Sequence, residues 1–154
     1  MSFNRYGAAL EICQQHAKRL RWAMEQMQPK QPFTVATLNN LTDMELAVVD
    51  QLLTRFAKLQ DTMGASLFPA VLELTKEQGD LHAFIDKLHR LEKIGAIDSS
   101  DGWLLLREMR NSYAHEYPDD PVLQAAQMNK FLTLAASLLT TFKRVEKFAN
   151  RYAQ

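Results

Sequence analysis

The chain has few of the residues that interrupt helices, form disulfides or bind metals. Its 154 residues include five glycines, five prolines and a single cysteine, Cys13. One cysteine excludes an intramolecular disulfide and suits the reducing cytoplasm, where we expect the protein to lie. His16, His82 and His89 do not have the spacing of metal ligands, so we expect no metal site and no cofactor.

An excess of one charge and long apolar runs are also missing. Eighteen basic residues balance eighteen acidic ones, so any nucleic-acid site must be a local patch rather than a property of the whole molecule. No run approaches the roughly eighteen apolar residues of a membrane span, and the N-terminus lacks an apolar signal-peptide core. Hydrophobic residues make up 47% of the chain, which fits one globular domain over residues 1–154.

Apolar residues recur instead at steps of three and four, and no strand-like alternation is present. This pattern predicts an all-α protein, an up-and-down bundle of about five helices with short connections. The first long helix is expected from Phe3 to Met27. Pro29 and Pro32 should end it, before a loop that continues to about Asn40.

A second long helix is expected to begin at a capping box. Thr42 is its N-cap, and Glu45 stands three residues later. Gly64 and Pro69 should kink or divide this helix, and a weaker helical stretch follows to about Gln78. Its apolar stripe is expected to comprise Met44, Val48, Leu52, Phe56, Leu59 and Met63.

Three more helices are expected in the second half of the chain. Asp80 is the predicted N-cap of the third helix, and Gly95 is its predicted C-cap. Residues 99–101 should cap a fourth helix that Pro118 ends, and residues 119–121 should open the last. Their apolar positions include Leu81, Ile85 and Ile94 in the third helix, Trp103, Leu106 and Met109 in the fourth, and Phe131, Phe142 and Tyr152 in the last.

The segment 110–117 carries the residues best suited to chemistry. A histidine such as His115 titrates near neutral pH and can remove the proton of a ribose 2′-hydroxyl. An arginine such as Arg110 binds phosphate through two donors and can stabilise charge that develops on its oxygens. Together they can support metal-independent cleavage of RNA.

The spacing of the two catalytic candidates favours a dimer. Five residues on an ideal helix correspond to about 140° of rotation, so Arg110 and His115 do not share a face, whereas Asn111 and His115 do. Two copies of the helix that meet about a two-fold axis bring arginines and histidines around one cleft. We therefore expect a homodimer with a composite site.

The pattern Arg110-x4-His115-x-Tyr117, with Asn111 after the arginine and Pro118 at the helix end, resembles the signature of the HEPN superfamily. More narrowly, it is similar to the HepT-like toxins and the nucleotidyltransferase-associated HEPN proteins. The resemblance implies a homodimeric endoribonuclease toxin of a type II/VII-like toxin–antitoxin module. It also implies a minimal nucleotidyltransferase as antitoxin, which in such modules can add adenylate to the motif tyrosine, here Tyr117.

Other interpretations of these residues stay open. The same cleft can belong to a non-catalytic subunit that holds a nucleotide or substrate for a nucleotidyltransferase. Arg110 and His115 can also simply cap and pair at a helix end, and Asn111 can be structural. Arg107, one turn before the motif, is expected to widen a positive cleft, and Tyr113 fits a core or interface aromatic.

Several remaining residues have plain structural interpretations. Cys13 lies on the apolar seam of the first helix, so a buried thiol is expected. Exposed helix positions account for His16, His82 and His89. The basic stretches 18–21 and 143–151 can contact an RNA backbone, although such stretches more often form a solvated helix face.

Overall fold

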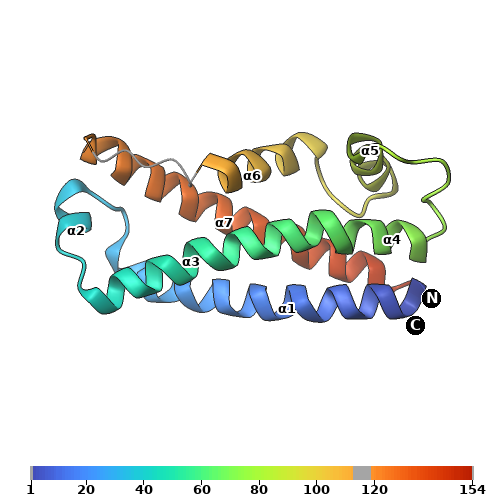
Figure 1. The fold of residues 1–154 in the computed structure, drawn as a ribbon, viewed down its shortest axis with the longest axis horizontal. Coiled ribbons are helices and arrows are strands. Elements are labelled where there is room, and N and C mark those ends of the chain that lie inside the picture. Colours follow the sequence, from blue (N-terminus) through green and yellow to red (C-terminus); the bar gives the residue numbers. More distant parts are fainter. Residues whose placement is uncertain (1, 113–118, 154) are drawn as a thin grey trace.

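The computed structural model describes residues 2–112 and 119–153, and these residues form a helical bundle without strands. About six helical segments are present in this part of the chain, because residues 28–30 continue the first helix and residues 43–74 run on as one helical rod. Figure 1 shows α1 (Ser2–Met27), α3 (Asp43–Thr62) and α7 (Pro121–Asn150) lying along the length of the molecule, with the two chain ends at the same end of the bundle. The elements are α1 (Ser2–Met27), η1 (Gln28–Lys30), α2 (Val35–Asn39), α3 (Asp43–Thr62), η2 (Met63–Leu67), α4 (Phe68–Leu74), α5 (Phe84–Ile94), α6 (Ser100–Ser112) and α7 (Pro121–Asn150).

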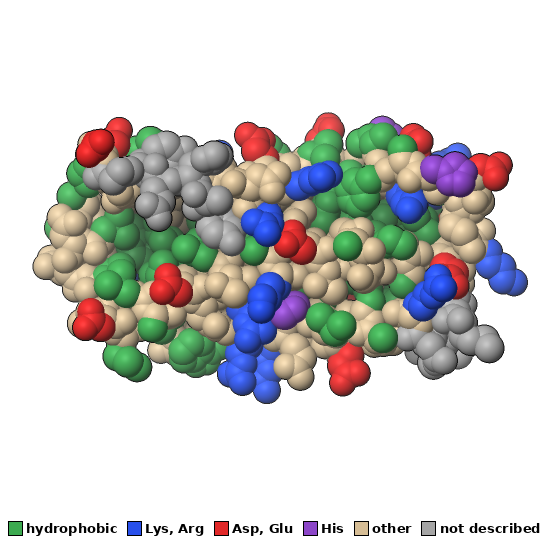
Figure 2. Space-filling model, viewed as in Figure 1, with side chains coloured by type: hydrophobic (Ala, Val, Ile, Leu, Met, Phe, Trp, Pro, Cys, Tyr) green, Lys and Arg blue, Asp and Glu red, His purple; other side chains and the backbone are tan. Residues whose placement is uncertain are grey.

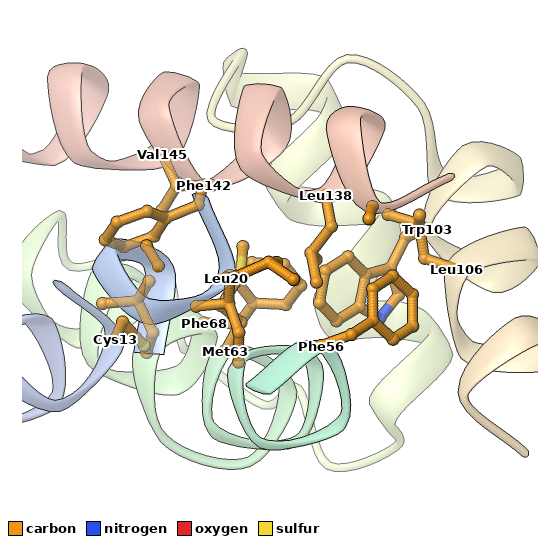
Figure 3. Packing of buried hydrophobic residues seen from close by; sticks show 14 of the residues in the cluster. Cys13, Leu20, Phe56, Met63, Phe68, Trp103, Leu106, Leu138, Phe142 and Val145 are labelled. Carbon is orange, nitrogen blue, oxygen red and sulfur yellow. The ribbon is translucent and has the colours of Figure 1, made fainter. Parts of the chain in front are cut away.

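The core forms where α1, α3, α6 and α7 meet. Figure 3 shows Leu20, Phe56, Trp103 and Phe142, one from each of these helices, converging on the same interior. All four side chains are buried. Because burial of large apolar side chains is the main favourable term in folding, this cluster fixes α6 and its C-terminal turns against the rest of the bundle.

Several predicted helix ends are confirmed. The capping box of α3 is complete: Glu45 N donates to Thr42 Oγ1 at 3.1 Å, and Thr42 N donates to Glu45 Oε1 at 2.9 Å. Gly95 ends α5 with a φ of 87°, a left-handed conformation that favours glycine. Asp120 caps α7 by accepting a hydrogen bond from Leu123 N at 3.0 Å.

The predicted loop up to Asn40 is wrong in part, because it contains the short helix α2. Thr34 caps this helix by accepting a hydrogen bond from Thr37 N. The preceding residue, Phe33, is held by Asn129 of α7, which accepts from Phe33 N at 2.7 Å and donates to Phe33 O at 2.9 Å. This tertiary clamp stabilises a five-residue helix that is too short to be stable alone.

The third predicted helix begins later than expected. Its N-cap is Ala83 rather than Asp80, so Leu81 precedes the helix, although it packs partly against the core. Lys76, with a φ of 60°, ends the α4 segment in a left-handed turn. The longer connection lets α5 run across the bundle instead of along it (Figure 1). In this orientation Ile85, expected on the apolar face, is exposed.

Where Gly64 and Pro69 were expected to kink or divide the second helix, the structure has a π-helix. Residues 63–67 form η2, and the chain continues into α4 without leaving the helical path. The helix therefore widens at Gly64 rather than ending there. The end of α4 at Leu74 shortens the helical stretch that was expected to reach Gln78.

Two further residues expected on apolar faces are exposed. Met44 is 77% exposed, although its place in the stripe of α3 predicted burial. It lies in the first turn of the helix, where it lines a surface pocket together with Trp22. Tyr152 lies just beyond α7, half exposed, with its ring 5.3 Å from that of Phe148. Within the described residues, no helix combines the length and apolarity of a membrane span.

Candidate functional site around Arg110

The structure places part of the predicted site on the last turns of α6. Arg107, Arg110 and Asn111 all belong to this helix, whereas His115 and Tyr117 lie outside the described residues, as does Tyr113. Asn111 is exposed. The arginine half of the motif is therefore on a rigid element that Trp103, Leu106 and Met109 anchor in the core.

Arg110 forms a bidentate ion pair with Asp61 of α3. Its Nε donates to Asp61 Oδ1 and its Nη2 donates to Oδ2, both at 3.0 Å. The side chains are 30% and 51% exposed, so the pair is open to water and contributes on the order of 1 kcal/mol to stability. Its larger effect is geometric, because two parallel hydrogen bonds fix the plane of the guanidinium.

Arg107 does not join this ion pair. Its guanidinium carbon lies 5.6 Å from the centre of the Phe84 ring at the start of α5, in cation–π contact. Arg107 is exposed and lies one helical turn before Arg110. Two positive side chains of α6 therefore reach toward different neighbours, one toward α3 and one toward α5.

A surface pocket of about 370 Å³ lies beside the Arg110–Asp61 pair. One wall consists of Gln60 and Asp61 at the end of α3 and of Gly64 and Ala65 in the π-helix. Gln60 is almost completely buried, which is unusual for an amide. The two small residues leave space that a larger side chain would fill.

The opposite wall of the pocket is largely aromatic. It consists of Phe84, Trp103 and Arg107. The Trp103 ring also packs against Phe68, with 4.5 Å between ring centres, so its position is fixed. Its indole nitrogen is buried and has no hydrogen-bond partner within the described part of the chain. Figure 2 shows hydrophobic side chains between the α3–α4 rod and α5, with basic side chains beside them.

A second group of basic side chains lies across α1 and α3. His16, expected to be exposed, is half-buried, and its Nδ1 lies 3.0 Å from Arg55 Nη1. Burial lowers the pKa of His16, and the charges of Arg55 and Lys58 lower it further. The histidine is therefore neutral near pH 7, and its Nδ1 accepts a hydrogen bond from Arg55.

Arg19, Arg55 and Lys58 form what we call the basic patch. Arg19 and Arg55 line one surface pocket with Trp22, and Trp22 is 44% exposed. Among the described residues, none of the three cations has a carboxylate oxygen within 4.0 Å. Figure 2 shows this concentration of positive charge over the middle of α1, beside a histidine. A chain with zero net charge therefore carries a locally positive surface.

Arg144, in the basic stretch 143–151, makes structural contacts. Arg144 donates to the carbonyl oxygen of Gly95 at 3.2 Å and lies 3.5 Å from Asp98. It therefore links α7 to the turn that follows α5. In the described part of the chain, no group of three or more His, Cys, Asp or Glu side chains could hold a metal ion.

Sequence reasoning missed Asp61 and the pocket beside it. Asp61 is 49 residues from Arg110, and no local pattern marks it among the other acidic residues of α3. Gly64 was the one signal present, because a glycine inside a strongly periodic helix indicates close packing or a functional reason. Comparison of the chain with protein-family models, curated proteins and solved structures gives no match.

Proposed function

We propose that the protein is an endoribonuclease toxin of the HEPN type, in which two copies of the chain form a composite active site. The observation that carries the proposal is the placement of Arg110, whose guanidinium plane Asp61 fixes at the partly exposed C-terminal end of α6. Asn111 follows it on the surface, and His115 and Tyr117 complete the motif in sequence.

The proposed chemistry needs no metal. His115 takes the proton of a ribose 2′-hydroxyl, and the 2′-oxygen then attacks the adjacent phosphorus. The bond to the 5′-oxygen of the next nucleotide breaks, and that oxygen leaves with a proton from water, while His115 returns its proton to the solvent. Arg110 of the second copy binds the phosphate and stabilises the negative charge that grows on its oxygens. The products are a 2′,3′-cyclic phosphate and a free 5′-hydroxyl.

Exposed apolar side chains on both sides of residues 113–118 support the dimer. Leu104 and Leu105 lie on α6, and Val122 and Leu123 lie in the first turn of α7. Large apolar side chains that stay exposed to water favour association. A two-fold axis near them would bring two motif segments together, as the spacing of Arg110 and His115 requires.

The basic patch supports contact with an RNA backbone. Arg19 and Lys58 are exposed, and phosphates can neutralise them directly. Trp22, exposed beside Arg19, offers a face on which an unpaired base can stack. These contacts would give the protein affinity for single-stranded RNA although its net charge is zero.

Control of the toxin is proposed to act through Tyr117. A cognate minimal nucleotidyltransferase, as antitoxin, would attach adenylate to its hydroxyl group. The added phosphate would place negative charge two residues from His115 and would repel the RNA phosphate from the cleft.

A second candidate function is supported by the Asp61–Arg110 pair itself. Asp61 occupies two donors of the motif arginine, and the neighbouring pocket of about 370 Å³ has the size of a small-ligand site. In this alternative, the chain binds a nucleotide as a non-catalytic partner of the nucleotidyltransferase and cleaves nothing.

Growth arrest on expression separates the two functions. The wild-type chain should stop growth, whereas Arg110→Ala and His115→Ala should not. Tyr117→Phe should stay toxic even when a cognate nucleotidyltransferase is co-expressed. Normal growth with wild type, together with stable co-purification of that nucleotidyltransferase, would instead support the binding subunit.

The composite site has a test of its own. Co-expression of Arg110→Ala with His115→Ala yields mixed dimers that keep one intact pair of Arg110 and His115 across the two-fold axis. These dimers should recover part of the RNA cleavage that either variant lacks alone. No recovery, in mixed dimers verified by differently tagged chains, would show that each copy uses its own residues.

A further inference from the structure

We infer that the pocket between α3, the π-helix η2, α5 and α6 binds the base of a ribonucleotide whose phosphate faces Arg110. The inference rests on the proposed function for its choice of ligand, because it identifies the substrate group that lies next to the reacting phosphate. The pocket volume of about 370 Å³ lies within the range of small-ligand sites, roughly 300–1,000 Å³.

The shape of the pocket suits a flat ring. Phe84 and Trp103 line the same wall, and because Trp103 is almost completely buried, the partly exposed Phe84 ring supplies most of its aromatic surface. The contact with Phe68 holds the tryptophan ring in place. Bases stack on aromatic side chains regardless of their sequence, because every base has a π-face. The guanidinium of Arg107, which lies over the Phe84 ring, adds a planar cation at the edge of this wall.

The π-helix creates the space on the opposite wall. Single-turn π-helices are rare and occur often at functional sites. Here the widened turn presents Gly64 to the pocket, where a Cβ atom would lie 3.6 Å from Trp103 and 3.8 Å from Phe84. A single methyl group at this position would therefore contact both aromatic rings.

Polar groups around the pocket match the edges of a base. Gln60 offers an amide with both donors and acceptors, although the residue is only 4% exposed. Trp103, another residue of the wall, has a buried indole N–H that lacks an acceptor among the described residues. Carbonyl oxygens and ring nitrogens of a base are acceptors of the kind that these donors need.

Asp61 connects the pocket to the motif. Its carboxylate lines the pocket and also holds Nε and Nη2 of Arg110. A nucleotide whose base enters the pocket therefore has its sugar and phosphate beside the guanidinium. This arrangement would make the base next to the cleaved bond a determinant of specificity.

A pair of neighbouring substitutions tests the inference by direct binding. Ala65 and Ser66 are both exposed residues of η2, but only Ala65 lines the pocket. Ala65→Leu should fill the pocket, and Ser66→Leu should add the same bulk outside it. The full-length proteins are titrated by calorimetry with the four ribonucleoside 5′-monophosphates and with ribose 5-phosphate, which lacks the base.

The expected result is that wild type binds at least one nucleotide more tightly than ribose 5-phosphate, by about tenfold or more. Ala65→Leu should weaken that nucleotide about tenfold, whereas Ser66→Leu should leave it within about twofold. Gly64→Ala should also weaken binding, while its Tm stays equal to or above that of wild type, because alanine favours a helix more than glycine. Loss of binding in this variant therefore cannot come from unfolding.

Three results would overturn the inference. They are equal affinity for ribose 5-phosphate and every nucleotide, normal binding by Ala65→Leu, and no binding of any nucleotide at millimolar concentration. RNA cleavage measured in parallel separates this inference from the proposed function. If wild type cleaves RNA and Ala65→Leu binds nucleotide and cleaves RNA normally, the pocket inference is rejected and the proposed nuclease function stands. If wild type cleaves no RNA but binds a nucleotide that Ala65→Leu does not bind, the nuclease function is rejected and the pocket inference stands.

Discussion

The guanidinium of Arg110 is held edge-on by both carboxylate oxygens of Asp61, 49 residues away in sequence, through two hydrogen bonds of 3.0 Å. This pair joins α6 to α3 at the edge of the pocket. It has two opposing effects on a phosphate ligand. It orients the arginine, and it places a negative charge next to the site that the phosphate would occupy.

Asp61→Asn separates these two effects. We expect kcat for RNA cleavage to fall about tenfold because Arg110 loses its fixed orientation. The KM for RNA should fall as well, because a negative charge beside the phosphate is removed. Steady-state kinetics on a short RNA would measure both constants.

The matched control is Asp50→Asn, an exposed carboxylate of the same helix that makes no ion pair within the described residues. It should leave kcat unchanged. An unchanged kcat in Asp61→Asn, together with weaker RNA binding, would contradict an orienting role for Asp61.

The helices were predictable because their signals are local. The capping box at Thr42 and Glu45 and the αL glycine at Gly95 lie within the turns that they end or begin. The short helix α2 was not, because Asn129 of α7 holds its N-terminal side from 96 residues away. The choice of Asp61 as partner of Arg110 depends in the same way on how α3 and α6 pack, which no short pattern encodes.

The sequence predicts which face of a helix is buried, but not whether each residue on that face is buried. Met44 keeps the helical phase of α3 but lies in its first turn, where it stays 77% exposed. Cys13, in the middle of α1, lies opposite other helices and is fully buried, as its phase predicted. For the site, sequence placed Arg107, Arg110 and Asn111 on one helix correctly, whereas the pocket requires three separate segments to pack.

The basic patch should contribute to the salt dependence of RNA binding. Lys58→Gln removes one exposed cation, so the slope of log K against log salt concentration for a single-stranded RNA should decrease by about 0.7. Fluorescence anisotropy at several salt concentrations would measure the slope. Lys143→Gln, an exposed lysine of α7, serves as the comparison and should leave the slope unchanged. Equal slopes for wild type and Lys58→Gln would show that Lys58 of the basic patch does not contact the RNA.

Cys13 should be inert in the folded protein. Burial raises the pKa of its thiol to about 12, and the side chain is fully buried, so thiolate is scarce and inaccessible. We expect no reaction with iodoacetamide at pH 8 in buffer and complete alkylation in concentrated denaturant, as followed by mass spectrometry. Rapid alkylation under native conditions would mean that α1 is not packed as described.

His16 should make stability depend on pH in the acid range. Its folded pKa is lowered below about 6.5 by burial and by Arg55 and Lys58, so the unfolded chain takes up the proton first. The stabilisation is complete above about pH 6.5 and is lost as the pH falls below it. Thermal melts should therefore show a steeper fall in Tm from pH 7 to pH 5 for wild type than for His16→Gln.

A second variant checks the cause of this shift. Lys58→Gln removes one of the two charges that lower the pKa of His16, so its melts should depend on pH less steeply than those of wild type. Parallel curves of Tm against pH for all three proteins would show that folding does not lower the pKa of His16.

The central claim is that Arg110 and His115 cleave RNA together, and its most direct measurement is the cleavage of a defined single-stranded RNA by the purified protein in the presence of EDTA. Wild type should produce fragments that end in a 2′,3′-cyclic phosphate, whereas His115→Ala, and Arg110→Ala with a Tm lowered by roughly 2–4 °C, should reduce the rate at least about a hundredfold. Equal cleavage by wild type and His115→Ala, or no cleavage by wild type, would contradict it.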